Sequence, residues 1–261
     1  MAYEKNRRRP AREDDGTLIE GRNAVLETLR AGRAVDKVFV AEGARIGDVA
    51  AEARRHGVPV VTCDRRKLDH MSPTGNHQGV IAQAAAQEYV SLDDIFRVAE
   101  ERGEVPLIVV CDGIEDPHNL GAIIRTAEAA GAHGVIIPKR RGVGLTATVA
   151  KTSAGAVEYM PVVRVANIVS TIEELKQKGL WIFCADMDGQ PWCSTDMGGP
   201  IGIVVGAEGS GVSRLTKEHC DFVVSLPMNG QVNSLNASVA AAIVIYEAVR
   251  QRNGLPSFHK K

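Results

Sequence analysis

The chain has 261 residues, of which 44% are hydrophobic and 24% charged, a composition typical of a soluble globular protein with one or two domains. Its 31 Lys and Arg residues nearly balance 32 Asp and Glu residues, giving a net charge of −1. This balance excludes a uniformly basic nucleic-acid binder but not a local basic face. Aromatic residues make up only 4%, which argues against a surface built from rows of stacking rings.

Cysteine and histidine are scattered along the chain. The five cysteines are odd in number and include no CxxC pair, so we expect reduced thiols in a cytoplasmic protein. The seven histidines form no HExxH pattern or Cys/His cluster, so no metal site is predicted. The basic N-terminus lacks the apolar segment of a secretory signal, and no apolar run is long enough to span a bilayer, so we expect no membrane partner.

The first part of the chain reads as an arm, a small domain and a connection. Residues 1–16 are polar and basic and are predicted to be a disordered arm, either a solubilising tail or a contact for phosphates. Residues 17–86 have the pattern of a small α/β binding domain, and residues 87–104 that of a partly helical linker. In the small domain, helices are predicted at 22–29, 46–56 and 65–71, and strands at 37–41, 58–62 and 80–86.

The second domain, residues 105–261, alternates strands and helices. Strands are predicted at 106–111, 134–138, 158–165, 180–186, 201–206 and 222–226, and helices at 119–130, 169–178 and 233–252. Continuous apolar strands such as 107–110 indicate burial on both faces, which is typical of a parallel sheet covered by helices. Ligands of such sheets bind beyond the carboxyl ends of the strands.

Two loops at that edge carry polar residues. Residues 112–125 follow a buried strand and open a helix, and Arg125 on that helix can reach back toward Asn119, although a solvated pair with Glu128 is an equal alternative. Residues 206–213 have glycines in a GxxGxG spacing that differs from the dinucleotide-binding GxGxxG. This second loop is either a tight turn or a close backbone approach to a ligand, and Glu208 inside it could orient donors or neutralise a cation.

A third polar loop, residues 226–238, precedes a long apolar helix. It contains Asn233, Ser234 and Asn236, and helix capping explains one of these residues but not all three. Because parallel strands bring such loops to one edge, we expect the third loop to lie with Asn119, Arg125 and Glu208 around a common site.

Three segments in this order carry a family resemblance: NLGAIIRTAEAAG, IVVGAEGSGVS and LPMNGQVNSLNASVA. They resemble the ordered motifs of the SpoU/TrmH family of RNA 2′-O-ribose methyltransferases within the SPOUT superfamily, over residues 105–252. Residues 17–86, with IEGRNAVLETL and HQGVIA, are similar to the ribosomal-protein-like RNA-binding domain that precedes the catalytic domain in many members. The two-domain layout is most like the members that methylate a guanosine of 23S ribosomal RNA.

The resemblance implies an α/β C-terminal SPOUT domain with a deep trefoil knot, S-adenosyl-L-methionine as cofactor, a homodimer formed through this domain, and RNA rather than DNA as substrate. By motif position it assigns Arg125 as the main catalytic residue, surrounded by Asn119, Glu208, Ser234 and Asn236. The implied cofactor contacts are backbone groups of Gly206, Leu226 and Leu235, with Ile203 and Met228 lining the pocket. Ser153 falls in a further segment that is similar to the family.

Chemistry limits what Arg125 can do. A guanidinium with a pKa above ~12 is a poor proton acceptor near neutral pH, so we favour Arg125 as a clamp on a phosphate and a stabiliser of developing negative charge over Arg125 as the base. A deprotonated Arg125 in a special environment stays open. The residues available for other phosphates are Arg54, Arg55, Arg65, Arg66, Lys67, Lys139, Arg140 and Arg141.

Three alternatives accompany this interpretation. Transfer RNA could replace ribosomal RNA as the substrate. The protein could be a non-catalytic RNA-binding assembly factor, against which the complete set of motif residues argues. A nucleotide-dependent oxidoreductase on an open sheet is disfavoured because GxGxxG is absent.

Overall fold

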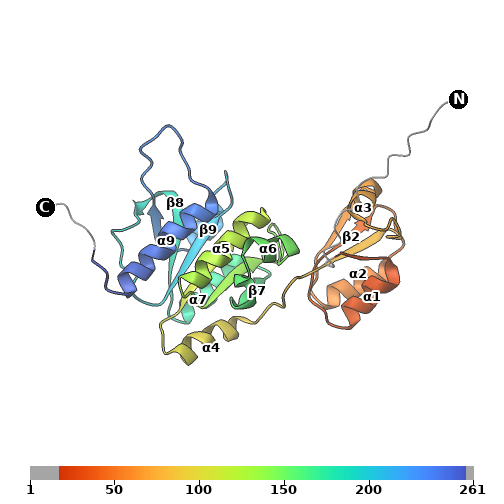
Figure 1. Ribbon diagram of the computed structural model, residues 1–261, viewed down its shortest axis with the longest axis horizontal. Helices are drawn as coiled ribbons and strands as arrows, with labels where there is room; N and C mark the ends of the chain where they lie inside the picture. The colour runs from red at the N-terminus through yellow and green to blue at the C-terminus, as the bar shows by residue number, and fades with distance from the viewer. Residues whose placement is uncertain (1–17, 257–261) are drawn as a thin grey trace. The chain divides into compact units, whose positions relative to one another are not determined.

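The computed structural model describes residues 18–256, and the chain divides into two compact units between Ala85 and Ala86 (Figure 1). The basic arm predicted for residues 1–16 lies outside the described residues. None of the helices within residues 18–256 has the length and apolar character required to cross a membrane.

The first unit is a four-stranded mixed sheet with helices on both faces. Its elements are β1 (Leu18–Glu20), α1 (Arg22–Arg30), β2 (Val35–Ala41), α2 (Gly47–Arg55), β3 (Val60–Cys63), α3 (Arg65–Met71) and β4 (Val80–Ala84). The strand order is β1-β4-β2-β3, with β2 parallel to β3 and antiparallel to β4. Alternation along β2 sends Val38 toward α1 and α2 and Phe39 toward Leu68 of α3, which gives the unit two small apolar layers.

The second unit is built on a six-stranded parallel sheet in the order β10-β8-β9-β5-β6-β7. Its strands are β5 (Leu107–Asp112), β6 (Gly134–Pro138), β7 (Val162–Val165), β8 (Trp181–Pro191), β9 (Ile201–Gly206) and β10 (Phe222–Ser225). Its helices are α4 (Leu92–Arg102), α5 (Pro117–Ala129), α6 (Ala147–Thr152), α7 (Ile168–Gln177), α8 (Arg214–Glu218) and α9 (Ala237–Arg252), with a 3₁₀ turn at Ala156–Glu158.

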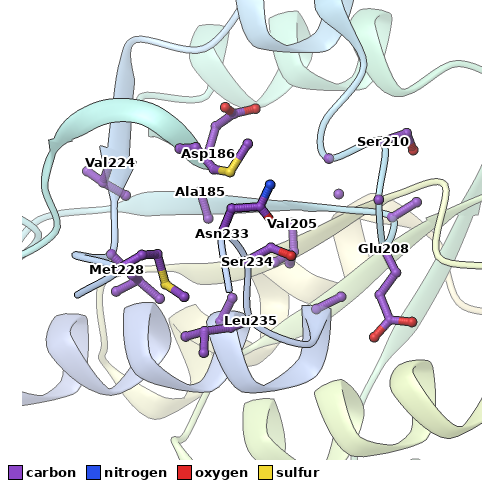
Figure 2. Close-up of a pocket in the computed structure, with 18 residues that line it drawn as sticks. Ala185, Asp186, Val205, Glu208, Ser210, Val224, Met228, Asn233, Ser234 and Leu235 are labelled. Carbon is purple, nitrogen blue, oxygen red and sulfur yellow. The ribbon is translucent and has the colours of Figure 1, made fainter. Parts of the chain in front are cut away.

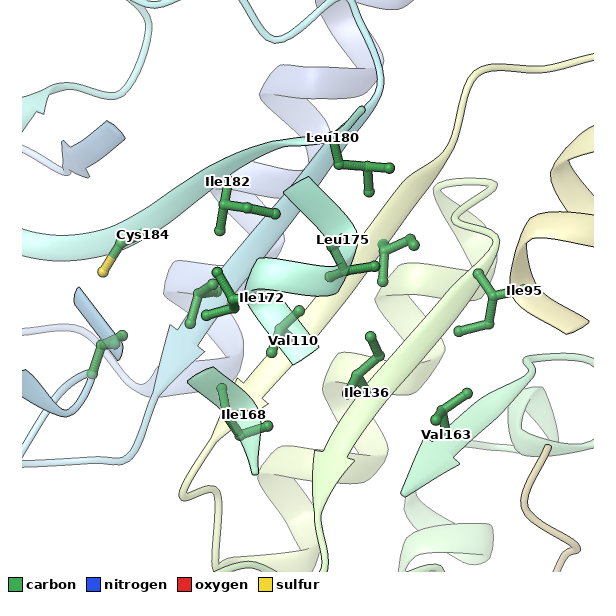
Figure 3. Close-up of a cluster of buried hydrophobic side chains, with 13 residues drawn as sticks. Ile95, Val110, Ile136, Val163, Ile168, Ile172, Leu175, Leu180, Ile182 and Cys184 are labelled. Atoms are coloured by element: carbon green, nitrogen blue, oxygen red, sulfur yellow. The ribbon is translucent and has the colours of Figure 1, made fainter. Parts of the chain in front are cut away.

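Both faces of this sheet are covered, as its continuous apolar strands predict. On one face, Ile172 and Leu175 of α7 pack against Val110 of β5, Ile136 of β6 and Ile182 of β8 (Figure 3). Helices α5 and α9 pack against each other, α9 against β9 and α5 against β6. The parallel α/β fold class expected from the sequence is therefore confirmed.

The segment 87–104, interpreted as a linker, has a larger role than a connection. It contains α4, which begins with a capping box between Ser91 and Asp94. Ile95 of this helix is completely buried in the same apolar cluster as α7 (Figure 3). A buried isoleucine stabilises the helix on the second unit, so α4 is part of that unit's core.

Two boundaries differ from the predictions for local reasons. The strand expected at 158–165 begins only at Val162, because Ala156–Glu158 form a 3₁₀ turn after the left-handed Gly155. The helix expected at 233–252 begins at Ala237, because the side chain of Asn236 caps it and leaves residues 233–235 outside the helix.

Candidate active site

Three strand ends meet at the carboxyl edge of the second sheet. Asp112 at the end of β5 lies beside Gly206 at the end of β9, and its Oδ2 accepts a hydrogen bond of 2.9 Å from the backbone N–H of Ser213. The chain leaving β9 is thereby tied back to β5. The sequence analysis placed no weight on Asp112, although a carboxylate at the end of a buried parallel strand is a signal for this edge.

The glycine-rich turn after β9 is very tight. Ala207 and Gly211 exchange two backbone hydrogen bonds of 3.1 and 2.9 Å. A Cβ atom on Gly206 would lie 2.0 Å from the carbonyl carbon of Gly211, which is far inside van der Waals contact. Gly206 is therefore required, because the chain returns so closely that no side chain fits there. The two interpretations of this loop, a tight turn and a close approach to a ligand, are compatible, because the same turn also lines a cavity.

The first cavity has a volume of about 410 Å³ and lies between the glycine turn, the middle of β8 and the start of α9 (Figure 2). Figure 2 shows Ser234 and Leu235 near its centre, Met228 on one side and Glu208 on the other. Its wall includes four of the five residues assigned to the cofactor by resemblance: Gly206, Leu226, Met228 and Leu235. The fifth, Ile203, is buried within β9 and does not line the cavity, whereas Val205, on the same face of that strand, does.

Asp186, at the same cavity, was missed by the sequence analysis. It follows the buried part of β8, and its Oδ1 forms a 3.0 Å ion pair with Nζ of Lys217. The hydrogen bond from this ion pair raises the pKa of Lys217 above its ordinary value, so the lysine stays charged and the carboxylate keeps its partner.

A second cavity, with a volume of about 560 Å³, adjoins the first. It is lined by residues 112–116, Asn119 and Arg141, together with the glycine turn. The two cavities share four wall residues, which are Ala207, Glu208, Ser210 and Gly211. Two molecules bound in these cavities would meet at Glu208.

Asn236 joins the three loops through one side chain. Its Oδ1 accepts hydrogen bonds from the backbone N–H groups of Ser238 and Val239 at 3.0 and 3.3 Å, which caps α9. Its Nδ2 donates to Oδ1 of Asn119 at 2.8 Å and to Oε1 of Glu208. Since the oxygen caps the helix, both amide protons are free for these two acceptors, and the predicted convergence of Asn119, Glu208 and Asn236 is present.

Arg125 does not join this cluster. It lies on the exposed side of α5 and lines neither cavity. With residues 18–256 it makes no hydrogen bond or ion pair, so the alternative of a pair with Glu128 is not formed either. Six residues separate it from Asn119, which is about 9 Å along the helix axis. The expectation that the guanidinium faces the site within one chain is therefore not met.

Ser153 has a local structural role. It is completely buried, and its hydroxyl donates to the carbonyl of Ala150 at 2.9 Å at the end of α6. The preceding Thr152 packs so closely against Gly121 of α5 that a Cβ there would lie 1.9 Å from its hydroxyl oxygen. This segment fixes α5, and with it Asn119, against α6.

Within the described part of the chain, no three His, Cys, Asp or Glu side chains gather as a metal site. The two adjoining cavities at the edge of a parallel sheet, with a glycine turn and a carboxylate between them, can hold two ligands side by side, as a group-transfer enzyme requires.

Comparison with known proteins identifies the family. The SpoU rRNA methylase family model matches residues 106–246, and the model of the RNA 2′-O ribose methyltransferase substrate-binding domain matches residues 18–90. The chain belongs to the SpoU rRNA methylase family. It is similar to a Bacillus subtilis protein assigned to the TrmH family of tRNA/rRNA methyltransferases, with 50% identity over 90% of this chain and 96% of that protein.

Solved structures agree. The SpoU methyltransferase AviRb from Streptomyces viridochromogenes, in complex with the cofactor AdoMet, is 28% identical and covers 91% of this chain and 90% of its own, with a TM-score of 0.58. The TrmH/SpoU tRNA-modifying enzyme of A. aeolicus is 30% identical and covers 62% of this chain and 86% of its own, with a TM-score of 0.54.

Proposed function

We propose that this protein transfers the methyl group of S-adenosyl-L-methionine to the 2′-hydroxyl of a guanosine ribose in 23S ribosomal RNA. The observation that carries the proposal is the shared wall at Glu208, since a group transfer needs its donor and acceptor sites to adjoin. Family membership and the substrate-binding domain match support RNA as the acceptor.

The first cavity fits the cofactor. Its volume of about 410 Å³ is within the range of small-molecule sites, and apolar walls at Leu226 and Leu235 suit a purine ring. The carboxylate of Glu208 suits a ligand that carries positive charge, whereas Asp186 is already paired with Lys217. Because Gly206 brings the backbone of the turn close to the cavity, main-chain groups there and at Leu226 and Leu235 would hold the cofactor. When bound, S-adenosyl-L-methionine supplies an activated methyl group on a sulfonium.

The acceptor hydroxyl would be held at the shared wall. Oε1 of Glu208 is occupied by Asn236, whereas Oε2 has no partner among residues 18–256 and can accept a hydrogen bond from the 2′-hydroxyl. Asn236, which is itself bonded to Asn119, keeps the carboxylate of Glu208 in place. Ser234 lines the first cavity, on the cofactor side of Glu208. Positioning of this kind can contribute roughly 7–11 kcal/mol to lowering the barrier.

Arg125 retains a role through the RNA backbone. Its guanidinium has no partner within residues 18–256 and lies on the same helix as Asn119. We assign it to a phosphate of the RNA backbone outside the two cavities, which it would hold through charge-assisted hydrogen bonds. It would not serve as the base, because a guanidinium is a poor proton acceptor near neutral pH.

The N-terminal unit would supply most of the RNA affinity. Arg54, Arg65 and Arg66 are exposed on α2 and α3 and are available for phosphates. The low aromatic content favours recognition of folded RNA by its shape and 2′-hydroxyls. The homodimer, the trefoil knot and the cytoplasmic location implied by the resemblance stay predictions, and sedimentation of the full chain would test the dimer.

Transfer RNA is the second candidate substrate. The relative from Bacillus subtilis is assigned to a family that acts on tRNA or rRNA. The tRNA-modifying enzyme of A. aeolicus, however, covers only 62% of this chain, so it offers no counterpart for the complete two-unit protein. We favour ribosomal RNA because the substrate-binding domain is present.

The test is a methylation assay with mapping. Purified protein is incubated with radiolabelled S-adenosyl-L-methionine and total bacterial RNA, and the labelled ribose is located. Label at a 2′-O-methylguanosine of the large-subunit RNA is expected. Label in transfer RNA would favour the second candidate, and no incorporation in any RNA, together with no cofactor binding in calorimetry, would support the assembly factor instead.

A further inference from the structure

The second cavity contains polar groups that the proposed transfer step does not use. The residues that line it include Asp112, Glu115, Asp116, Asn119 and Arg141. Two of these are already engaged, because Asp112 accepts a hydrogen bond from Ser213 and Asp116 caps α5 through His118. Asp112 and Asp116 therefore stabilise the wall of the cavity. The remaining residues are Glu115, Asn119 and Arg141.

Those three residues have polar groups that a ligand could use, and Glu115 and Arg141 are exposed. Glu115 and Arg141 make no hydrogen bond or ion pair with any residue from 18 to 256. Asn119 is only 6% exposed and uses its Oδ1 to accept from Asn236, but its Nδ2 donates to nothing in the described chain. This nitrogen is not among the buried side-chain atoms that lack a partner, so it is accessible and can donate to a ligand in the cavity.

The charge of the wall restricts the ligand. Glu115, Asp116 and Glu208 outnumber Arg141 and disfavour a phosphate in this cavity, so we do not assign Arg141 to the phosphate contact considered from the sequence. The free carboxylate accepts hydrogen bonds, and the free guanidinium donates two in parallel. The ligand must therefore offer N–H donors on one side and two adjacent acceptors on another.

Among the RNA bases, guanine has this pattern. It offers acceptors at O6 and N7, the pair to which an Arg donates in a bidentate contact, and donors at N1 and at the N2 amino group. Adenine presents an amino donor where guanine has O6, so its N–H would face the guanidinium. A base reaches such a cavity when it is splayed out of the RNA stack.

We propose that Glu115 and Arg141 are specificity-determining residues that read the guanine base of the target nucleotide in the second cavity. Arg141 donates to O6 and N7, and Glu115 accepts from N1 and N2. With the base there, the attached ribose lies at the wall that this cavity shares with the first, beside Glu208. The inference rests on the proposed function, because it requires a nucleotide as the acceptor.

The first experiment compares four variants of the full-length protein. Arg141→Ala and Glu115→Gln alter the cavity, whereas Arg102→Ala and Glu128→Gln remove matched charges at exposed positions outside both cavities. Methyl transfer is measured on an unmodified transcript of bacterial large-subunit RNA. Arg141→Ala is expected to lower kcat/KM by about tenfold or more, since a bidentate base contact contributes at least that factor. Affinity for S-adenosyl-L-methionine should stay at the wild-type value.

The second experiment identifies the atom that is read. Once the target position is mapped, a single 7-deazaguanosine is placed there by ligation, which removes the N7 acceptor. The wild-type enzyme should lose activity on this RNA, and Arg141→Ala should lose little more, because its partner for N7 is already gone.

The outcomes separate the two levels of the argument. If wild-type protein transfers no methyl group to RNA, the proposed function fails. If wild-type protein forms 2′-O-methylguanosine but the cavity variants behave like Arg102→Ala and Glu128→Gln, the function stands and this inference is overturned. Methylation of a nucleotide other than guanosine would also overturn it.

Discussion

Substitutions of Asn236 offer a quantitative test of the site, because its amide oxygen and its amide nitrogen make different hydrogen bonds. The oxygen caps α9, and the nitrogen bridges Asn119 and Glu208. In Asn236→Ser a hydroxyl can still cap the helix, but the bridge is gone. In Asn236→Ala both are lost.

The expected losses of stability follow from these contacts. Loss of an N-cap costs about 1 kcal/mol. Leaving the side-chain carbonyl of the nearly buried Asn119 without a donor also costs about 1 kcal/mol, which is the lower end of the range for a buried polar group, because water can enter beside the exposed Asn236. Asn236→Ala should therefore destabilise the second unit by about 2 kcal/mol and Asn236→Ser by about 1 kcal/mol. In a unit of this size, each kcal/mol lowers Tm by about 2–4 °C.

The assays are calorimetric unfolding of the full chain and methyl transfer to RNA. Both variants should lose a comparable part of kcat/KM, since both lack the bridge, while only Asn236→Ala loses the cap. Equal Tm values for the two variants would refute the capping contribution. Wild-type kcat/KM in Asn236→Ser would refute the claim that the bridge positions Glu208.

Three further predictions address the glycine turn, the Arg125 guanidinium and the buried His133. Gly206→Ala should abolish S-adenosyl-L-methionine binding in calorimetry, because the added Cβ would lie 2.0 Å from the carbonyl carbon of Gly211. Gly199→Ala is the control, because a Cβ there meets no atom within 4 Å, and wild-type affinity in Gly206→Ala would contradict the turn geometry. Arg125→Ala should lower kcat/KM for RNA, and Arg125→Lys should recover only part of it with an unchanged pH profile, since a lysine keeps the charge but not the planar two-donor geometry. Full recovery in Arg125→Lys would show that the planar guanidinium is not needed. A shifted pH profile would favour Arg125 as the base. Burial lowers the pKa of His133, whose Nδ1 accepts a hydrogen bond from the backbone N–H of Leu107. The free energy of unfolding should therefore fall as the pH drops below the ordinary histidine pKa of 6.5, by at most about 1.4 kcal/mol per pH unit. His133→Gln should remove this slope in unfolding experiments between pH 5 and 8.

Much of the fold follows from patterns that are local in the sequence. Apolar runs such as 107–110 and 201–205 predict buried parallel strands, and the helix around Leu120 and Ile124 is visible in its spacing. By contrast, the place of α4 depends on burial of Ile95 against strands far along the chain, which periodicity alone does not show. The two short helices α6 and α8 are held by tertiary contacts and caps and have too few turns to give a clear period.

The site was predictable where its residues are fixed by strand ends. Glu208 and Asn236 follow elements that the sequence identifies, and parallel topology brings them together. Arg125 shows the limit, because the direction of a long side chain on an exposed helix face depends on what it binds, and residues 18–256 give it no partner. The second cavity was also missed, since Glu115 and Arg141 are 26 positions apart and neither forms a recognisable motif.

A crystal structure of the full chain with S-adenosyl-L-methionine and a guanosine-containing RNA fragment tests the arrangement most directly. We predict that the cofactor occupies the cavity behind Gly206 and Leu226, with its methyl group directed toward Glu208 and a ribose 2′-oxygen on the other side of that residue. A cofactor bound elsewhere, or a methyl group turned away from the cavity lined by Asn119, would contradict the account.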